Sequence, residues 1–322
     1  MNENDRTVDL EDLEELSPGI DDLSLFNAKD SNGNHRFNAP IPFGMAPELE
    51  FIIEDFLPSG ILGMVVATGG SGKTMFLTQL AYCVASGREF MGMRTVDPRK
   101  VLYVYAEETN EEIHRRLDRI RDHHGDSGDC ENLDRLCGYG MDLRFEEEEK
   151  DERIKDQLGK YIARFDPGLV ILDPTAHFSC AENENDSVQT NKFVRMLRTL
   201  TRSGTTVLIA HHTSKFGSNQ SDQHSSRGSS ALTDGARWVL NMTGYDSTRR
   251  WEKELEEIDQ NELWKYKIAE ITKVNNFMPR DRIMYLRMEG SGIIMRGPEE
   301  ECMLTESQEN RNTGRGVRRR AA

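Results

Sequence analysis

A glycine-rich loop that ends in lysine and threonine carries the clearest chemistry in the sequence. The loop consists of Thr68, Gly69, Gly70, Ser71, Gly72, Lys73 and Thr74. Glycine-rich backbone can turn its N–H groups toward phosphate oxygens, Lys73 adds a positive charge, and Thr74 offers a hydroxyl to Mg²⁺. Ala67 stands where the strict motif has glycine, a small departure. The loop predicts a binding site for the phosphates of ATP and its magnesium ion.

An aspartate after an apolar run is the expected second oxygen ligand of that magnesium. Asp173 follows Leu169–Leu172, four apolar residues that predict a strand buried on both faces. Open α/β sheets bind ligands at the carboxyl ends of their strands, where Asp173 would lie. The alternative is that Asp173 caps the turn before Pro174. The glycine loop upstream favours magnesium binding.

Two adjacent glutamates are candidates for the base that orients the attacking water. Glu107 and Glu108 follow the apolar run Val101–Ala106. A carboxylate at that strand end, across the cleft from the glycine loop, can reach the γ-phosphate side. Alternatively, both belong to the first turn of a helix, where the helix dipole favours negative charge. The residues alone leave both interpretations open.

The elements that must position these groups follow an α/β pattern. The five strand-like runs are Leu62–Ala67, Val101–Ala106, Leu136–Tyr139, Leu169–Leu172 and Thr206–Ala210. Their continuous apolar character predicts a mostly parallel sheet flanked by helices. We expect an amphipathic helix from the loop to about Ser86 and a second helix capped by Asn110. Residues 264–297 predict antiparallel strands that extend the sheet edge.

The formal net charge of −15 is concentrated in short segments. Residues 1–45 carry −7, residues 146–152 and 252–262 carry −5 each, and residues 307–322, with five arginines, carry +4. The remainder is close to neutral, at −2. Net charge therefore does not exclude a nucleic-acid partner, but it confines contact to a few local cations.

Composition also sets the expected domains and compartment. We expect an acidic, disordered leader over 1–45, one domain over 46–300 and a basic, disordered tail over 301–322. The alternative for the leader is a short helix that docks on a partner. The five cysteines have no CxxC spacing, and the sequence has no membrane span and no signal peptide. These features predict a cytoplasmic protein without a disulfide framework or structural zinc.

Beyond single motifs, the chain resembles the hexameric replicative DNA helicases of the plasmid RepA type, within the RecA-like ATPases of the AAA family. The resemblance rests on GGSGKTMFLTQLA, AEETNEEIHRRL, LVILDPTAHF, TVLIAHHTSK and SSRGSSALTDGARW, which occur in this order. It covers roughly residues 46–297. The last two segments are far more specific than the glycine loop. The resemblance implies a RecA-like fold and ATP hydrolysis dependent on Mg²⁺.

The resemblance also implies roles for individual residues. It assigns nucleotide and magnesium binding to Lys73 and Thr74, the catalytic base to Glu107 and the magnesium-linked carboxylate to Asp173. The pair His211-His212 ends the next strand as the γ-phosphate sensor, and we favour His212 as the group that touches phosphate. A metal-binding histidine pair is disfavoured because adjacent side chains on a strand point to opposite faces. One of the two histidines is expected to be structural.

Three basic residues are assigned by the same resemblance. Arg237 matches the arginine finger that reaches the nucleotide of the neighbouring subunit, where a guanidinium stabilises the charge of the transferring phosphoryl group. Arg116 and Lys273 match basic residues near the nucleotide. Hydrolysis would therefore depend on assembly into a ring, expected to be a hexamer.

The long polar stretch 215–230 is the expected contact with single-stranded DNA. In RecA-like rings a loop at this position lines the central channel. Lys215 and Arg227 could contact phosphates and Phe216 could stack on a base, although Arg227 could instead serve the nucleotide site. An initiator or primase is a further expected partner.

These inferences predict an ATP-dependent replicative helicase. The first alternative is a regulatory or recombination-accessory ATPase of the RecA/KaiC-like type, without unwinding activity. The second is a small-molecule P-loop kinase, which would need no arginine from a neighbouring subunit.

Overall fold

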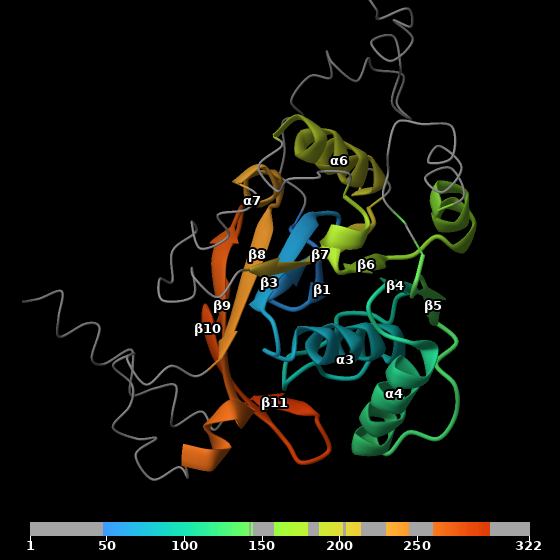
Figure 1. Cartoon of the computed structure of the whole chain (residues 1–322). Helices are drawn as coiled ribbons and strands as arrows, with labels where there is room; N and C mark the ends of the chain where they lie inside the picture. The colour runs from blue at the N-terminus through green and yellow to red at the C-terminus, as the bar shows by residue number, and fades with distance from the viewer. Residues whose placement is uncertain are drawn as a thin grey trace, which may run out of the picture. The chain divides into compact units, whose positions relative to one another are not determined.

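The computed structural model describes residues 48–141, 143, 158–179, 187–201, 204–213, 230–244 and 260–296 (Figure 1). Every element below belongs to the unit Leu49–Ala322. The segments 1–45 and 301–322, for which disorder is expected, lie outside the described residues. No helix within the described ranges is long and apolar enough to cross a membrane.

A nine-stranded sheet forms the centre of the described structure, in the order β11-β10-β9-β8-β3-β7-β6-β4-β5. Its strands are β3 (Leu62–Thr68), β4 (Val101–Tyr105), β5 (Leu133–Cys137), β6 (Leu169–Asp173), β7 (Thr206–Thr213), β8 (Trp238–Gly244), β9 (Tyr266–Val274), β10 (Ile283–Met288) and β11 (Ile294–Arg296). The strands from β8 to β5 pair in parallel, and β9, β10 and β11 are antiparallel. The expected fold class, a mostly parallel sheet with antiparallel C-terminal strands, is confirmed.

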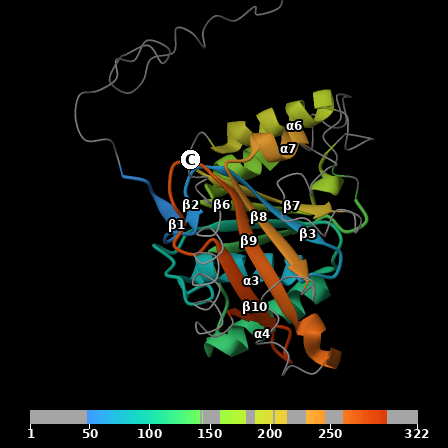
Figure 2. The same ribbon diagram turned by 90° about the vertical axis from the view of Figure 1, so that its left-hand side faces the viewer.

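Helices cover both faces of this sheet (Figures 1 and 2). They are α3 (Lys73–Ser86), α4 (Asn110–His124), α6 (Ser187–Leu200) and the short α7 (Ser230–Gly235), with 3-10 turns η1 (Thr175–His177) and η5 (Gln260–Lys265). One hydrophobic core joins α3 and α4 to alternate strand residues such as Tyr103 and Ile171. A second core joins α6 to the intervening residues, such as Leu102 and Val170. Burial on both faces explains the continuous apolar runs.

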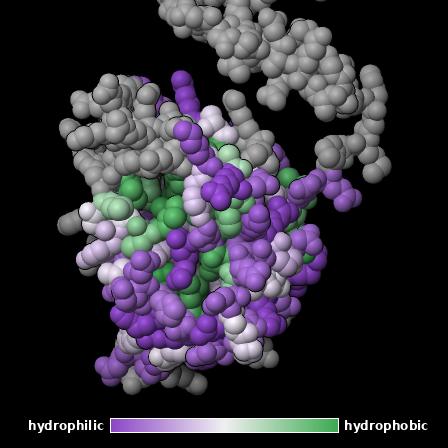
Figure 3. Space-filling model, turned by 90° about the vertical axis from the view of Figure 1, so that its right-hand side faces the viewer, coloured by the Kyte–Doolittle hydropathy of each residue, from purple (hydrophilic) through white to green (hydrophobic). Residues whose placement is uncertain are grey.

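The face that carries α4 and β5 is largely hydrophilic, with hydrophobic side chains gathered in one part of it (Figure 3). β5 is the last strand of the sheet on this side, and its residues are half-buried or exposed. Tyr139 and Met141, just beyond the strand, are exposed. The open edge of the sheet explains why this strand is less apolar than the central ones.

Several details differ from the sequence expectations. Helix α3 is not amphipathic but almost wholly buried, because the antiparallel end of the sheet packs on it as well: buried Gln79 exchanges hydrogen bonds with the backbone of Ile294 in β11, at 2.9 and 3.2 Å. The N-cap of α4 is Thr109 and not Asn110, because Thr109 and Glu112 form a capping box. Strand β8 was not expected, nor was the hairpin of β1 (Phe51–Ile53) and β2 (Leu57–Pro58).

Candidate nucleotide site

The glycine loop lies between β3 and α3, as the motif predicts. Ser71 turns the loop back on itself, since its N–H and hydroxyl both donate to the carbonyl of Thr68, at 3.2 and 2.7 Å. Gly70 and Gly72 have φ values of 78° and 88°, which favour glycine. Gly72 precedes α3 without a side-chain cap, so the first N–H groups of the helix remain available to an anion. A Cβ on Gly69 or Gly70 would meet open space, which leaves room for phosphates above the loop.

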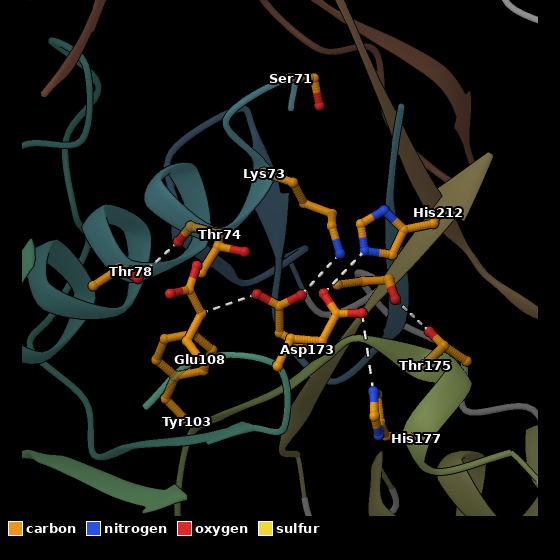
Figure 4. Close-up of polar contacts among 12 residues, drawn as sticks. Ser71, Lys73, Thr74, Thr78, Tyr103, Glu108, Asp173, Thr175, His177 and His212 are labelled. Carbon is orange, nitrogen blue, oxygen red and sulfur yellow. Dashed lines mark hydrogen bonds and ion pairs between the residues drawn. The ribbon is translucent and has the colours of Figure 1, made fainter. Parts of the chain in front are cut away.

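Lys73 and Asp173 form a buried ion pair at the centre of the site (Figure 4). Lys73 Nζ lies 2.8 Å from Asp173 Oδ1, and both side chains are only 3% exposed. Strand β7 separates β3 from β6, so the two residues meet at the carboxyl edge of the sheet across one intervening strand. Asp173 makes this contact instead of capping the turn before Pro174.

The residues here fit a magnesium–nucleotide complex. Thr74 is half-buried in the first turn of α3, and its side chain points toward the region of Lys73 and Asp173 (Figure 4). A hydroxyl and a carboxylate are the hard oxygen donors that Mg²⁺ prefers, and a bound magnesium ion would neutralise phosphate charge. Open space above the loop, an anion-binding helix end and these oxygens therefore suit the expected ligand.

The two adjacent glutamates have different partners. Both precede Thr109, the N-cap of α4, so neither belongs to the first turn of the helix. Glu108 Oε1 lies 2.5 Å from Arg116 Nη2. Burial raises the pKa of Glu108, and the charge of Arg116 opposes this effect. Glu107 is instead 48% exposed, so its carboxylate is accessible to water.

Glu107 lies between two histidines from different elements. Its Oε2 is 3.4 Å from His212 Nε2, at the end of β7, and its Oε1 is 3.9 Å from His177 Nε2, in η1. His177 was missed at the sequence level. The indication was its position four residues after Asp173, close enough in sequence to stay at the same sheet edge. The Thr175 hydroxyl fixes η1 by donating to Ala210 of β7 at 2.6 Å.

The two histidines at the end of β7 have different surroundings, as expected for adjacent residues of a strand. His212 is half-exposed and faces Glu107, whereas His211 is buried. Burial lowers the pKa of His211 to about 4, and the nearby charges of Lys73 and His212 act in the same direction. His211 is therefore a neutral imidazole near pH 7, which suits a structural role.

Arg237 lies at the amino ends of the parallel strands, whereas the glycine loop lies at their carboxyl ends. Its backbone N–H donates to Leu62 O at 2.7 Å, and Leu62 begins the strand that ends at Thr68. A strand of that length spans about 20 Å. The exposed Arg237 side chain is therefore remote from the chain's own Lys73.

Lys273 also lies near the amino ends of the parallel strands and not beside the chain's own nucleotide loop. Its Nζ donates to the carbonyls of Thr233 and Asp234 in α7, at 2.8 and 3.1 Å. Arg198 of α6 holds the next carbonyl, that of Gly235, at 2.9 Å. Burial lowers the pKa of Lys273, and the charge of Arg237 contributes to the same shift. Two cations thus bind the C-terminal carbonyls of α7, directly before Arg237.

The residues expected to contact DNA, Lys215, Phe216 and Arg227, lie outside the described residues. Most of the other predicted site residues lie together at the carboxyl ends of the parallel strands, whereas Arg237 and Lys273 lie near the amino ends. The grouped set is Gly69, Gly70, Ser71, Gly72, Lys73, Thr74, Glu107, Arg116, Asp173, His211 and His212.

Two comparisons with known proteins give matches to this chain. A solved structure of a KaiC-like protein from the hyperthermophilic archaeon Pyrococcus horikoshii OT3 is similar, with 12% sequence identity and a TM-score of 0.49, over 77% of this chain and 94% of that chain. The model of the AAA_25 family, described as an AAA domain, matches residues 43–218, more than half of the chain. This segment contains the glycine loop, Glu107, Asp173 and both histidines of β7. The chain therefore belongs to the AAA domain family and is a P-loop ATPase.

Proposed function

We propose that the protein is an ATP-dependent replicative DNA helicase. Its subunits would form a ring, expected to be a hexamer, that hydrolyses ATP with Mg²⁺ at the subunit interfaces and moves along single-stranded DNA. The observation that carries the proposal is the separation of Arg237 from Lys73. In one chain the nucleotide loop lies at the carboxyl ends of the parallel strands, and Arg237 is fixed by its backbone at their amino ends.

This arrangement supports a site shared between two subunits. Lys73 and the loop would bind the phosphates, and Thr74 and Asp173 would hold magnesium. Glu107, open to solvent at the same edge, would orient the attacking water, and His212, 3.4 Å from Glu107, would contact the γ-phosphate. Arg237 of the next subunit would stabilise the charge that develops on the transferred phosphoryl group.

The position of His212 supports a link between hydrolysis and DNA. His212 is next to the last residue of β7, and Lys215 follows it after only two residues. A sensor that moves with the γ-phosphate would therefore shift the start of the proposed DNA loop, which contains Lys215, Phe216 and Arg227. The acidic segment 1–45 is the proposed docking region for an initiator or primase.

The test is ATP hydrolysis with and without single-stranded DNA, together with the mass of the particle in solution. We expect a ring whose ATPase rate rises with DNA, and a loss of this stimulation in Lys215→Ala and Arg227→Ala. Strand unwinding should follow the same pattern. An ATPase rate indifferent to DNA and to both substitutions would contradict the helicase and favour a regulatory ATPase without unwinding activity.

A further inference from the structure

A buried tyrosine holds the carboxylate that is proposed to bind magnesium (Figure 4). The phenol of Tyr103 donates to Asp173 Oδ2 at 3.1 Å, while Lys73 donates to Oδ1 at 2.8 Å. Tyr103 is fully buried. Both oxygens of Asp173 thus have a donor, and these donors come from different elements, β4 and α3.

The sheet register explains why a tyrosine is needed at this position. Tyr103 of β4 pairs with Ile171 of β6, two residues before Asp173. Ile171 and Asp173 point to the same face of the sheet, because side chains alternate along a strand. The ring of Tyr103 spans the distance along this face, which a shorter side chain could not do.

Asp173 is also tied to the first turn of α3. Lys73 donates to Asp173 Oδ1 at 2.8 Å, and Lys73 is the chain neighbour of Thr74, the other proposed magnesium ligand. Tyr103 and Lys73 therefore hold the two oxygens of Asp173 from β4 and from the helix that carries Thr74.

We propose that Tyr103 is a positioning residue, which orients Asp173 for magnesium. The inference rests on the proposed role of Asp173 as the magnesium-linked carboxylate. Tyr103 itself touches neither nucleotide nor metal in this account.

Tyr105 provides a matched control on the same strand. It is buried two residues further along β4, and its hydroxyl donates to Asn110 Oδ1 at 2.5 Å instead of to Asp173. Tyr103→Phe and Tyr105→Phe each remove one oxygen from a buried ring and leave the ring volume in place. Only the first change removes a donor from Asp173.

The experiment measures binding of a fluorescent, non-hydrolysable ATP analogue to the full chain while Mg²⁺ is titrated. For Tyr103→Phe we expect unchanged affinity without magnesium and about a tenfold rise in the Mg²⁺ concentration at half-maximal binding, the scale of one lost hydrogen bond to a charged group. Tyr105→Phe should keep the magnesium requirement of the parent. An unchanged requirement in folded Tyr103→Phe would overturn the inference.

Two further variants keep the outcomes distinct. Should Tyr103→Phe fail to fold, Tyr103→Met carries the test, because it also lacks a donor to Asp173; a rise in the magnesium requirement is expected, and an unchanged requirement contradicts the inference. Asp173→Asn tests the proposed function itself: if its magnesium requirement equals that of the parent, the assignment of Asp173 is wrong. A shift in Asp173→Asn without one in Tyr103→Phe overturns only the role of Tyr103.

Discussion

The backbone N–H of Arg237 donates a 2.7 Å hydrogen bond to the carbonyl of Leu62, the first residue of the strand that leads into the nucleotide loop. Arg237 is thereby fixed at the opposite end of that strand from Lys73. A guanidinium at this position cannot serve the nucleotide bound by its own chain. This geometry underlies the proposal of a shared site and two of the predictions below.

Replacing the proposed base should abolish hydrolysis without affecting binding. Glu107→Gln keeps the size of the side chain but cannot accept the proton of the attacking water. We expect the ATPase rate to fall by roughly 100- to 10,000-fold, with nucleotide affinity within a few-fold of the parent. Steady-state hydrolysis and analogue binding measure the two quantities.

Glu108→Gln is the matched control, because Glu108 pairs with Arg116 instead of facing the histidines. The ATPase rate of Glu108→Gln should fall by less than about tenfold, the scale of one exposed or half-buried ion pair. A larger loss in Glu108→Gln than in Glu107→Gln would reverse the assignment of the base.

Arg198, which donates to the last carbonyl of α7, should affect ATP hydrolysis only in the assembled ring. Arg198→Ala removes the donor to Gly235 O, two residues before Arg237, and so loosens the proposed finger. We predict a several-fold lower ATPase rate of the assembled protein, with nucleotide binding unchanged. Arg195→Ala, one turn earlier on α6 and exposed, is the control. Equal rates for the two variants would show that the anchor is dispensable.

The buried histidine on β7 should contribute to acid sensitivity. Burial lowers the pKa of His211 from 6.5 to about 4, so between these values the unfolded chain binds the extra proton. Stability is therefore complete above about pH 6.5 and is lost as the pH falls toward 4, by up to roughly 3 kcal/mol. Urea unfolding at several pH values measures this. His211→Gln should flatten the pH dependence of the free energy of unfolding. An equally steep dependence in that variant would show that His211 is not its cause.

Most of the sheet could be predicted because its central strands are buried on both faces. Runs such as Leu169–Leu172 have no polar residue that would suggest another structure. Strand β8 was missed because Asn241 and Thr243 interrupt its apolar character, and its place between β3 and β9 depends on pairing with distant segments. The cap of α4 was misplaced by one residue because threonine and asparagine both suit an N-cap, although Glu112 three residues after Thr109 was the available indication.

The site was predictable where one segment carries its own chemistry. The glycine loop and the strand-terminal Asp173 belong to this class. The contacts of Tyr103 with Asp173, and of His177 with Glu107, depend on which strands are neighbours in the sheet. No local pattern encodes that adjacency. The same holds for Arg198 and Lys273, whose partners are backbone carbonyls of α7.

The most direct test of the shared site mixes two inactive variants. Lys73→Ala disables the loop and Arg237→Ala disables the finger, so each variant alone should show almost no ATPase activity. In mixed rings, some interfaces place an intact Lys73 against an intact Arg237, and we predict partial recovery of the ATPase rate at equimolar mixing. The rate should depend on the mixing ratio. If the mixture is as inactive as either variant alone, although mixed rings form, the site is not shared between subunits and the account is wrong.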